Sequence, residues 1–153
     1  MSMSSTVPER SEFRSSDLSR SSPAVFAAAS DHPIRVTRRD GEPLVLMSES
    51  RDRARRRLLE LAAQLIAAAT DSEGTLSDRL VKVLPWMEAL SDGDRADCAE
   101  ELLSAARASF STNQPHLAVA TLTSWEETAA AIAAGLHTEP VEWLEEDEPV
   151  ERP

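Results

Sequence analysis

An Asp-Gly pair at positions 40 and 41 constrains this chain more than any other feature of its sequence. It stands between two short runs of alternating apolar and polar side chains, Ile34–Arg38 and Pro43–Met47. Asp-Gly between such runs is a strong signal for a β-hairpin, because glycine adopts the backbone torsions that a tight turn requires. We therefore predict a hairpin over residues 34–47. Two strands are not stable alone, so helices or a second copy of the sheet must cover one face.

The rest of the chain has helical patterns, apart from a possible short leading strand before Phe13, the first candidate core residue. Pro23 fits the first turn of a helix, where its missing N–H is not needed. Ser48 is a candidate N-cap for a long helix, Pro85 is expected to divide a later one, and Asn113 is a candidate cap for the last. The predicted helices cover residues 16–21, 22–30, 48 to a polar linker at 70–75, 75–90, 93–110 and 114–135.

Charge is distributed unevenly along the chain. Residues 1–57 carry a net charge of +3 and residues 58–153 a net charge of −14, within a total of −11. Halves of opposite sign indicate two different partners, nucleic acid for the basic half and a basic protein for the acidic half. A solubilising acidic surface is the alternative. Five arginines between Arg51 and Arg57 either contact phosphate or form a solvated helix face, and the acidic residues among them favour the solvated face.

Composition argues against several classes of protein. The only cysteine, Cys98, excludes an internal disulfide, and the histidines His32, His116 and His137 lack metal-ligand spacing. Glycine is too scarce for a phosphate-binding loop. We therefore expect no enzyme activity, no cofactor and no metal site. No apolar run is long enough to span a membrane and the N-terminus has no signal core, so a cytoplasmic protein is expected.

These patterns predict an α+β protein with a small N-terminal domain and a helical C-terminal region. The expected divisions are a flexible N-terminus, a domain carrying the hairpin, a linker, a helical region and an acidic flexible tail. Their predicted boundaries are residues 1–12, 13–69, 70–75, 76–136 and 137–153.

Two segments resemble the Phd/YefM (prevent-host-death) family of antitoxins, in particular its longer actinobacterial members. The first is SSDLSRSSPAVFAAASDHPIRVTRRDGEPLVLMSES, with its Leu-x-Arg helix start, its strand ending in Thr-Arg and its Gly-Glu-Pro turn. The second is LPWMEALSDGDRADCAEELLSAARAS, followed by SWEETAAAIAAG. Together they cover roughly residues 13–136.

The resemblance implies a homodimer that shares a β-sheet and binds operator DNA upstream of its own gene. In this family an arginine of the first helix and an arginine that ends the strand before the turn face DNA. The corresponding positions are Arg20 and Arg38, and the neighbouring Ser21, Ser22 and Arg39 are candidates for further contacts. The alternative for Arg38 and Arg39 is that they guard an edge strand against pairing.

The resemblance also implies that the C-terminal region neutralises a cognate toxin, a RelE-type ribonuclease or a Doc-like kinase. Candidate toxin-binding residues lie on the apolar row of the last helix and in the acidic tail: Leu122, Trp125, Glu126, Ala129, Ile132, Trp143 and Leu144. The same apolar row equally fits the core of a small helix bundle. Two other functions remain open, a transcriptional regulator without a toxin and a protein-interaction module that never touches DNA.

Overall fold

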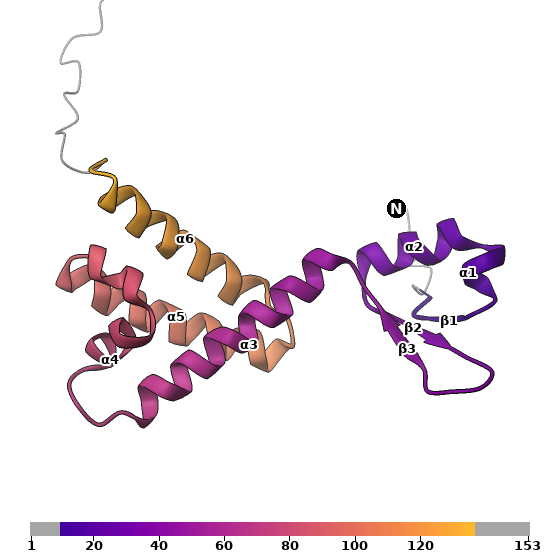
Figure 1. Cartoon of the computed structure of the whole chain (residues 1–153), viewed down its shortest axis with the longest axis horizontal. Helices are drawn as coiled ribbons and strands as arrows, with labels where there is room; N and C mark the ends of the chain where they lie inside the picture. The colour runs from indigo at the N-terminus through magenta and orange to yellow at the C-terminus, as the bar shows by residue number, and fades with distance from the viewer. Residues whose placement is uncertain (1–9, 137–153) are drawn as a thin grey trace, which may run out of the picture. The chain divides into compact units, whose positions relative to one another are not determined.

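The computed structural model describes residues 10–136, which form an α+β fold of helices and one three-stranded sheet (Figure 1). The chain divides into two compact units, which we call unit 1 (Met1–Leu59) and unit 2 (Glu60–Pro153). The division falls inside the long helix α3 (Glu49–Thr70), whereas the sequence placed it at 70–75. The predicted N-cap of α3 is present, because the Ser48 hydroxyl accepts a hydrogen bond from the Arg51 N–H at 3.3 Å.

Unit 1 holds the predicted hairpin and a third strand. Its elements are β1 (Glu12–Arg14), α1 (Asp17–Arg20), α2 (Ser22–Asp31), β2 (Ile34–Thr37) and β3 (Leu44–Leu46). The central strand β2 pairs in parallel with β1 and antiparallel with β3. The predicted boundary at residue 12 therefore falls inside β1. Ser11 also belongs to the ordered structure, since its carbonyl accepts a hydrogen bond from the Arg35 N–H at 2.8 Å.

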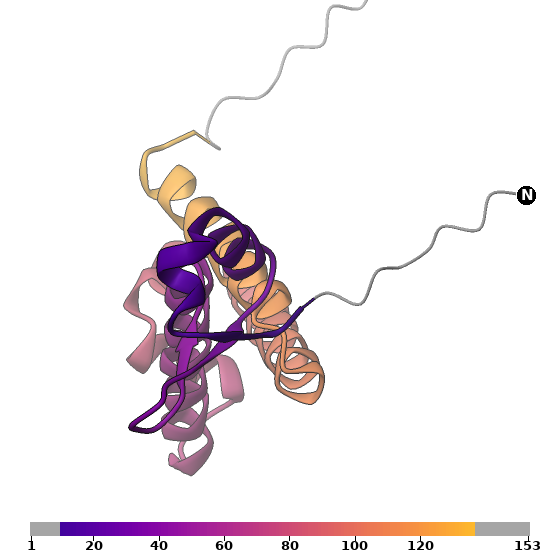
Figure 2. The ribbon, with the colours of Figure 1, turned by 90° about the vertical axis from the view of Figure 1, so that its right-hand side faces the viewer.

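The helices α1 and α2 lie on one side of this sheet (Figures 1 and 2). The core between them consists of one side chain from β1, two from α2 and two from β2: Phe13, Val25, Ala29, Ile34 and Val36. Phe13 is buried as predicted. Phe26, on the same helix α2, is 55% exposed and does not belong to this core.

The connection between β2 and β3 is longer than the predicted tight turn. The register pairs Val36 with Leu44, so the next pair would be Thr37 with Pro43. Proline has no N–H to donate, and the ladder ends there. Residues 38–43 form the loop, and Arg38 lies in this loop rather than in the strand. Asp-Gly thus marks the turn correctly but does not set its length.

Unit 2 is a small helical assembly. It contains the later part of α3, then α4 (Leu76–Val83), the 3₁₀ helix η1 (Pro85–Ala89), α5 (Asp92–Thr112) and α6 (His116–Ala133). Pro85 divides the helical segment as predicted. The helix α5 packs against α4 and α6, and α6 also packs against η1. Fully buried side chains from α4, η1 and α5 form much of the core, including Leu80, Met87, Cys98 and Leu102.

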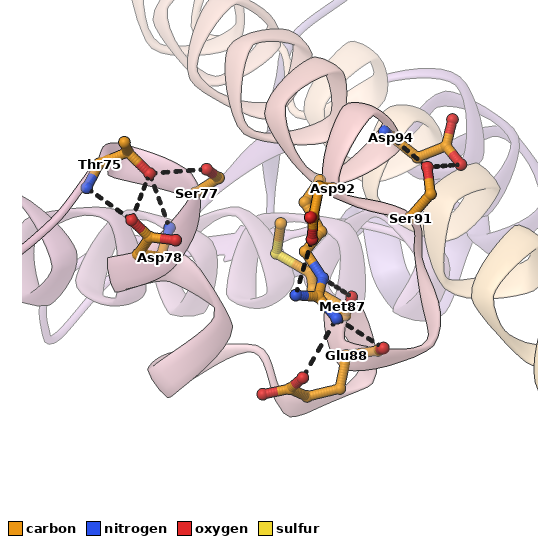
Figure 3. Close-up of polar contacts among 9 residues, drawn as sticks. Thr75, Ser77, Asp78, Met87, Glu88, Ser91, Asp92 and Asp94 are labelled. Carbon is orange, nitrogen blue, oxygen red and sulfur yellow. Dashed lines mark hydrogen bonds and ion pairs between the residues drawn. The ribbon is translucent and has the colours of Figure 1, made fainter.

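Side-chain caps and one arginine hold the turns of unit 2 (Figure 3). Thr75 and Asp78 form a reciprocal capping box at the start of α4, and the Ser91 hydroxyl accepts from the Asp94 N–H at 3.2 Å. Arg95 donates to the Met87 carbonyl at 3.0 Å and to the Glu88 carbonyl at 2.8 Å, which ties α5 to η1.

The segment predicted as a linker, 70–75, is part of this hydrogen-bonded arrangement. Lys82 Nζ donates to the Asp71 carboxylate at 2.7 Å, and Arg79 Nη1 donates to the Asp71 carbonyl at 2.6 Å. The pKa of Asp71 is lowered, first by the Lys82 hydrogen bond and then by the Glu73 N–H. These contacts fix the turn between α3 and α4 within unit 2.

One predicted cap is wrong. Asn113 does not begin the last helix; it ends α5 in the left-handed conformation, with φ 53° and ψ 33°. Asparagine tolerates this conformation better than most residues, which makes it a suitable C-terminal cap. At the start of α6 the buried Ser109 hydroxyl accepts a hydrogen bond from the Ala118 N–H at 3.0 Å. Gly135, where the predicted helix 114–135 ends, has a positive φ of 83° and follows α6 and its C-cap residue Ala134.

Candidate nucleic-acid interface and acidic groove

A basic pocket lies in unit 1 where β1 and β2 end. Because these strands are parallel, their carboxyl ends meet at the same edge of the sheet. Arg14 ends β1 opposite Thr37, and Arg38 and Arg39 follow β2. A pocket of about 450 Å³ opens there. Its lining, which we call the basic pocket, is Arg14, Ser15, Ser16, Thr37, Arg38 and Arg39.

Backbone hydrogen bonds fix the walls of the basic pocket. The Ser15 N–H donates to the Thr37 carbonyl at 2.8 Å and continues the pairing of β1 with β2. The Thr37 hydroxyl donates to the Phe13 carbonyl at 3.2 Å. These bonds hold the turn after β1 beside the start of the hairpin loop.

Asp17 organises the turn between β1 and α1. Its carboxylate accepts hydrogen bonds from the Arg14 N–H and from Arg10 Nη2, each at 2.9 Å. The pKa of Asp17 is lowered, chiefly by the Arg14 N–H and further by the charges of Arg10 and Arg14. Ser16 occupies the N-cap position of α1 but makes no side-chain cap.

The guanidinium group of Arg38 is held against the loop that carries it. Its Nε donates to the Glu42 carbonyl at 3.0 Å. Gly41 has φ 141°, and a Cβ there would lie 2.8 Å from Arg38 Nη2. The torsion favours glycine at this position, whereas the flexible end of the Arg38 side chain could move away from a Cβ.

The structure separates the predicted DNA-binding residues into two groups. Arg38 and Arg39 line the basic pocket, while Arg20, Ser21 and Ser22 do not. Arg20 is exposed in the last turn of α1, and Ser21 and Ser22 lie where α1 passes into α2. Sequence reasoning missed Arg14, Ser15 and Ser16. The available signal was Phe13 as a candidate core residue beside a possible leading strand, but the end of that strand at Arg14 is seen only in the structure.

The arginines that begin α3 support the solvated interpretation. Arg53 pairs with Glu49 at 2.9 Å, Arg56 pairs with Asp52, and both pairs have i, i+4 helical spacing. Arg51 Nη2 donates to the Asp31 carbonyl at 2.8 Å and so caps the end of α2.

The apolar row of α6 is divided between core and surface. Leu122 and Ala129 are 4% and 2% exposed and belong to the core of unit 2, as the bundle interpretation expected. Trp125, Glu126 and Ile132 are partly exposed. The candidate toxin contacts Trp143 and Leu144 lie outside the described residues.

A second hollow, which we call the acidic groove, lies between α5 and α6. It has a volume of about 500 Å³ and is lined by two carboxylates of α5, an indole and small residues of α6: Asp94, Glu101, Ala120, Thr121, Ser124, Trp125 and Thr128. Trp125 Nε1 donates to the Glu101 carboxylate at 2.8 Å. The basic side chains of unit 2 do not line the groove.

Other candidate chemistry is sparse in the described part of the chain. Residues 10–136 contain no group of three or more histidine, cysteine or acidic side chains placed to hold a metal ion. Burial in α5 raises the pKa of the Cys98 thiol to about 12, which suppresses its reactivity. None of the helices within residues 10–136 has the length and apolar character to cross a membrane.

Comparisons with protein-family models, with curated proteins and with solved structures find no match to this chain.

Proposed function

We propose that this protein is an antitoxin of a type II toxin–antitoxin system, with a Phd/YefM-like domain in unit 1. In this proposal unit 1 binds operator DNA and represses the protein's own operon, and unit 2 together with the acidic tail binds and blocks a cognate toxin. The observation that carries the proposal is the presence of two recognition surfaces of opposite charge, one in each unit.

The basic pocket supports the DNA-binding part of the proposal. Three arginines line it and no acidic residue does. Guanidinium groups suit nucleic acid because they bind phosphates and guanine edges through two parallel hydrogen bonds. Arg20 is exposed on α1 and is available for base contacts.

The edge strand β3 supports a homodimer through a shared sheet. It pairs only with β2 within the described residues, and its Leu44 and Val45 side chains are 53% and 63% exposed. An apolar edge strand has unpaired N–H and C=O groups that can pair with a strand of another chain. A two-fold dimer would present two basic pockets to a palindromic operator.

The acidic groove supports the toxin-binding part of the proposal. An indole beside two carboxylates suits a basic side chain, which would gain both charge and cation–π interactions. A toxin that acts on RNA or nucleotides carries such side chains in its active site. Neutralisation would then be occupation of that site, as expected for a RelE-type or Doc-like toxin.

A gel shift with the DNA upstream of the gene tests the repressor function. We expect a shift that weakens in Arg20→Ala and Arg38→Ala while the variants remain dimeric. Unchanged binding by both variants would contradict the assignment of these arginines.

Co-expression with the neighbouring gene tests the toxin function. We expect the full chain to restore growth that the neighbour alone stops, and Ser124→Lys in the acidic groove to reduce the rescue. Ala130→Lys is the matched control, because it adds the same charge to an exposed position of α6 outside the groove. Equal rescue by the two variants would remove the groove from the proposal.

The second candidate is a transcriptional regulator without a toxin. The burial of Leu122 and Ala129 favours it, because their contribution to unit 2 needs no partner. DNA binding without any toxic neighbour would select this alternative.

A further inference from the structure

We infer that the basic pocket of unit 1 binds one phosphodiester group of the DNA backbone, and that Arg14 is a principal ligand of that phosphate. The inference rests on the proposed DNA binding. It goes beyond that proposal because it adds residues to the site and names the chemical group that the site binds. It assigns Arg14, Ser15 and Ser16 to the site and gives Arg38 and Arg39 a role in phosphate binding rather than in reading bases.

The first argument is the charge that the fold concentrates there. The parallel pairing of β1 with β2 brings Arg14 to the same edge of the sheet as Arg38 and Arg39, although more than twenty residues separate them in the sequence. No carboxylate lines the pocket. Among residues 10–136, Arg38 and Arg39 form no ion pair, so their charge is not compensated by a direct partner.

The second argument is the set of hydrogen-bond donors. Ser15 and Ser16 line the pocket, and their hydroxyls make no hydrogen bond to the described part of the chain. Phosphate oxygens accept hydrogen bonds from serine hydroxyls and guanidinium groups, and two serines and three arginines line this pocket.

The third argument is what the backbone cannot supply. The Ser15 N–H is bonded to the Thr37 carbonyl and the Arg14 N–H to the Asp17 carboxylate. The helix α1 is only four residues long and offers no dipole of consequence. These two N–H groups are therefore not available to an anion, whereas the Arg14 side chain is exposed and its backbone is fixed by Asp17.

Phosphate binding and base reading make different predictions. A phosphate contact weakens binding to every sequence by the same factor when it is lost, and it lowers the salt dependence. A base contact changes the preference for one sequence over another. Arg20 lies outside the basic pocket and is the matching candidate for base reading.

The test begins with inorganic phosphate added to the full chain at constant ionic strength, with the amide signals of Ser15 and Ser16 followed by NMR. We expect saturable shifts in the natural protein and their loss in Arg14→Gln. The substitution removes the side-chain charge but keeps the backbone N–H that donates a hydrogen bond to Asp17, so folding should be retained. The absence of saturable shifts in the natural protein would overturn the inference.

The second measurement compares the upstream DNA with a scrambled fragment of equal length. For Arg14→Gln we expect equal weakening on both fragments, and a slope of log K against log salt that falls by about one per bound chain. Arg35→Gln is the control, because Arg35 is exposed on β2 and does not line the pocket. Weakening confined to the upstream fragment, or equal weakening by Arg35→Gln, would overturn the phosphate assignment.

These outcomes separate the inference from the proposed function. If the natural protein binds both fragments equally but Arg14→Gln lowers the slope, the pocket is confirmed and the operator proposal fails. If the natural protein prefers the upstream fragment and Arg14→Gln leaves the salt dependence unchanged, the operator proposal is supported and the phosphate site is contradicted. Phosphate shifts without any DNA binding would show a site for free phosphate and overturn the assignment to a phosphodiester.

Discussion

The basic pocket and the acidic groove of this protein differ in how they are built. The basic pocket of unit 1 forms where two strands and the loops that follow them meet, and its residues come from distant parts of the sequence. The acidic groove of unit 2 lies between two adjacent helices, and its residues follow helical spacing. At the sheet edge, strand pairing brings together charged residues that are distant in the sequence. In the helix pair, residues a few positions apart in the sequence lie on the same face. The first kind of site is therefore harder to find from sequence alone.

The largest expected effect tests whether α6 is a core helix or a free binding surface. Leu122→Ala should lower the free energy of unfolding by about 2–5 kcal/mol, because it leaves a cavity at a buried position. Thermal or denaturant unfolding monitored by circular dichroism would measure this. The matched control is Leu117→Ala on the same helix, where the side chain is 51% exposed and the change should be small. Equal effects would contradict the assignment of Leu122 to the core.

The next effect tests how strictly the hairpin loop is shaped. Gly41→Ala should destabilise the protein by roughly 1–3 kcal/mol, because a residue with a side chain is strained at φ 141°. If unit 1 binds DNA as proposed, the DNA affinity of the variant should fall as well. Gly93→Ala is the control, since Gly93 lies inside α5 where alanine is the better helix former. Equal stability of Gly41→Ala and the natural protein would contradict the strained backbone torsion at position 41.

A smaller effect tests the hydrogen bond beside the acidic groove. Trp125→Phe keeps the aromatic packing but removes the donor to Glu101, which should cost about 1 kcal/mol. Trp86→Phe is the matched control, because the Trp86 indole makes no hydrogen bond within residues 10–136. Denaturant unfolding of both variants decides, and identical values would show that the Trp125 bond contributes nothing.

The smallest expected effect is the loss at low pH of the stability that Asp17 contributes. The pKa of Asp17 is lower in the folded chain than its ordinary value of 3.8. The stability that Asp17 contributes is therefore complete above pH 3.8 and is lost as the pH falls through the lower, folded value. Asp17→Asn should remove this part of the pH dependence. Carboxyl titration by NMR measures the shift, and a pKa at or above 3.8 would contradict the turn geometry.

Much of the local structure follows from the sequence because short-range rules decide it. Pro85 divides a helical segment and Ser48 caps the start of α3. Gly135 follows the end of α6 with a positive φ, a conformation that glycine adopts readily. Asn113 was assigned to the wrong helix because asparagine serves at both ends, and only the backbone torsion distinguishes them. The linker at 70–75 was inferred from polar composition, which does not reveal that Asp71 is bonded to Lys82 and Arg79.

The candidate sites divide in the same way. Arg38 and Arg39 could be named from the sequence, because they directly precede the turn that Asp40 and Gly41 predict. Arg14 could not, because its place depends on a parallel pairing between strands that are far apart in the chain. Along α6, periodicity identified one apolar row, but the row contains both buried Leu122 and partly exposed Trp125. Which of them is covered depends on where α5 and η1 pack.

The sequence by itself determined the element order, the hairpin, the helical second half and the opposite charges of the two halves. These depend on residue type and on spacings of a few residues, which act before the chain folds. The tertiary structure decided that the third strand β1 joins the sheet, that the compact units divide within α3, and that three arginines share one pocket. Each of these depends on which distant segments pair, and long-range pairing is set by the packing of the whole unit rather than by any local run of residues.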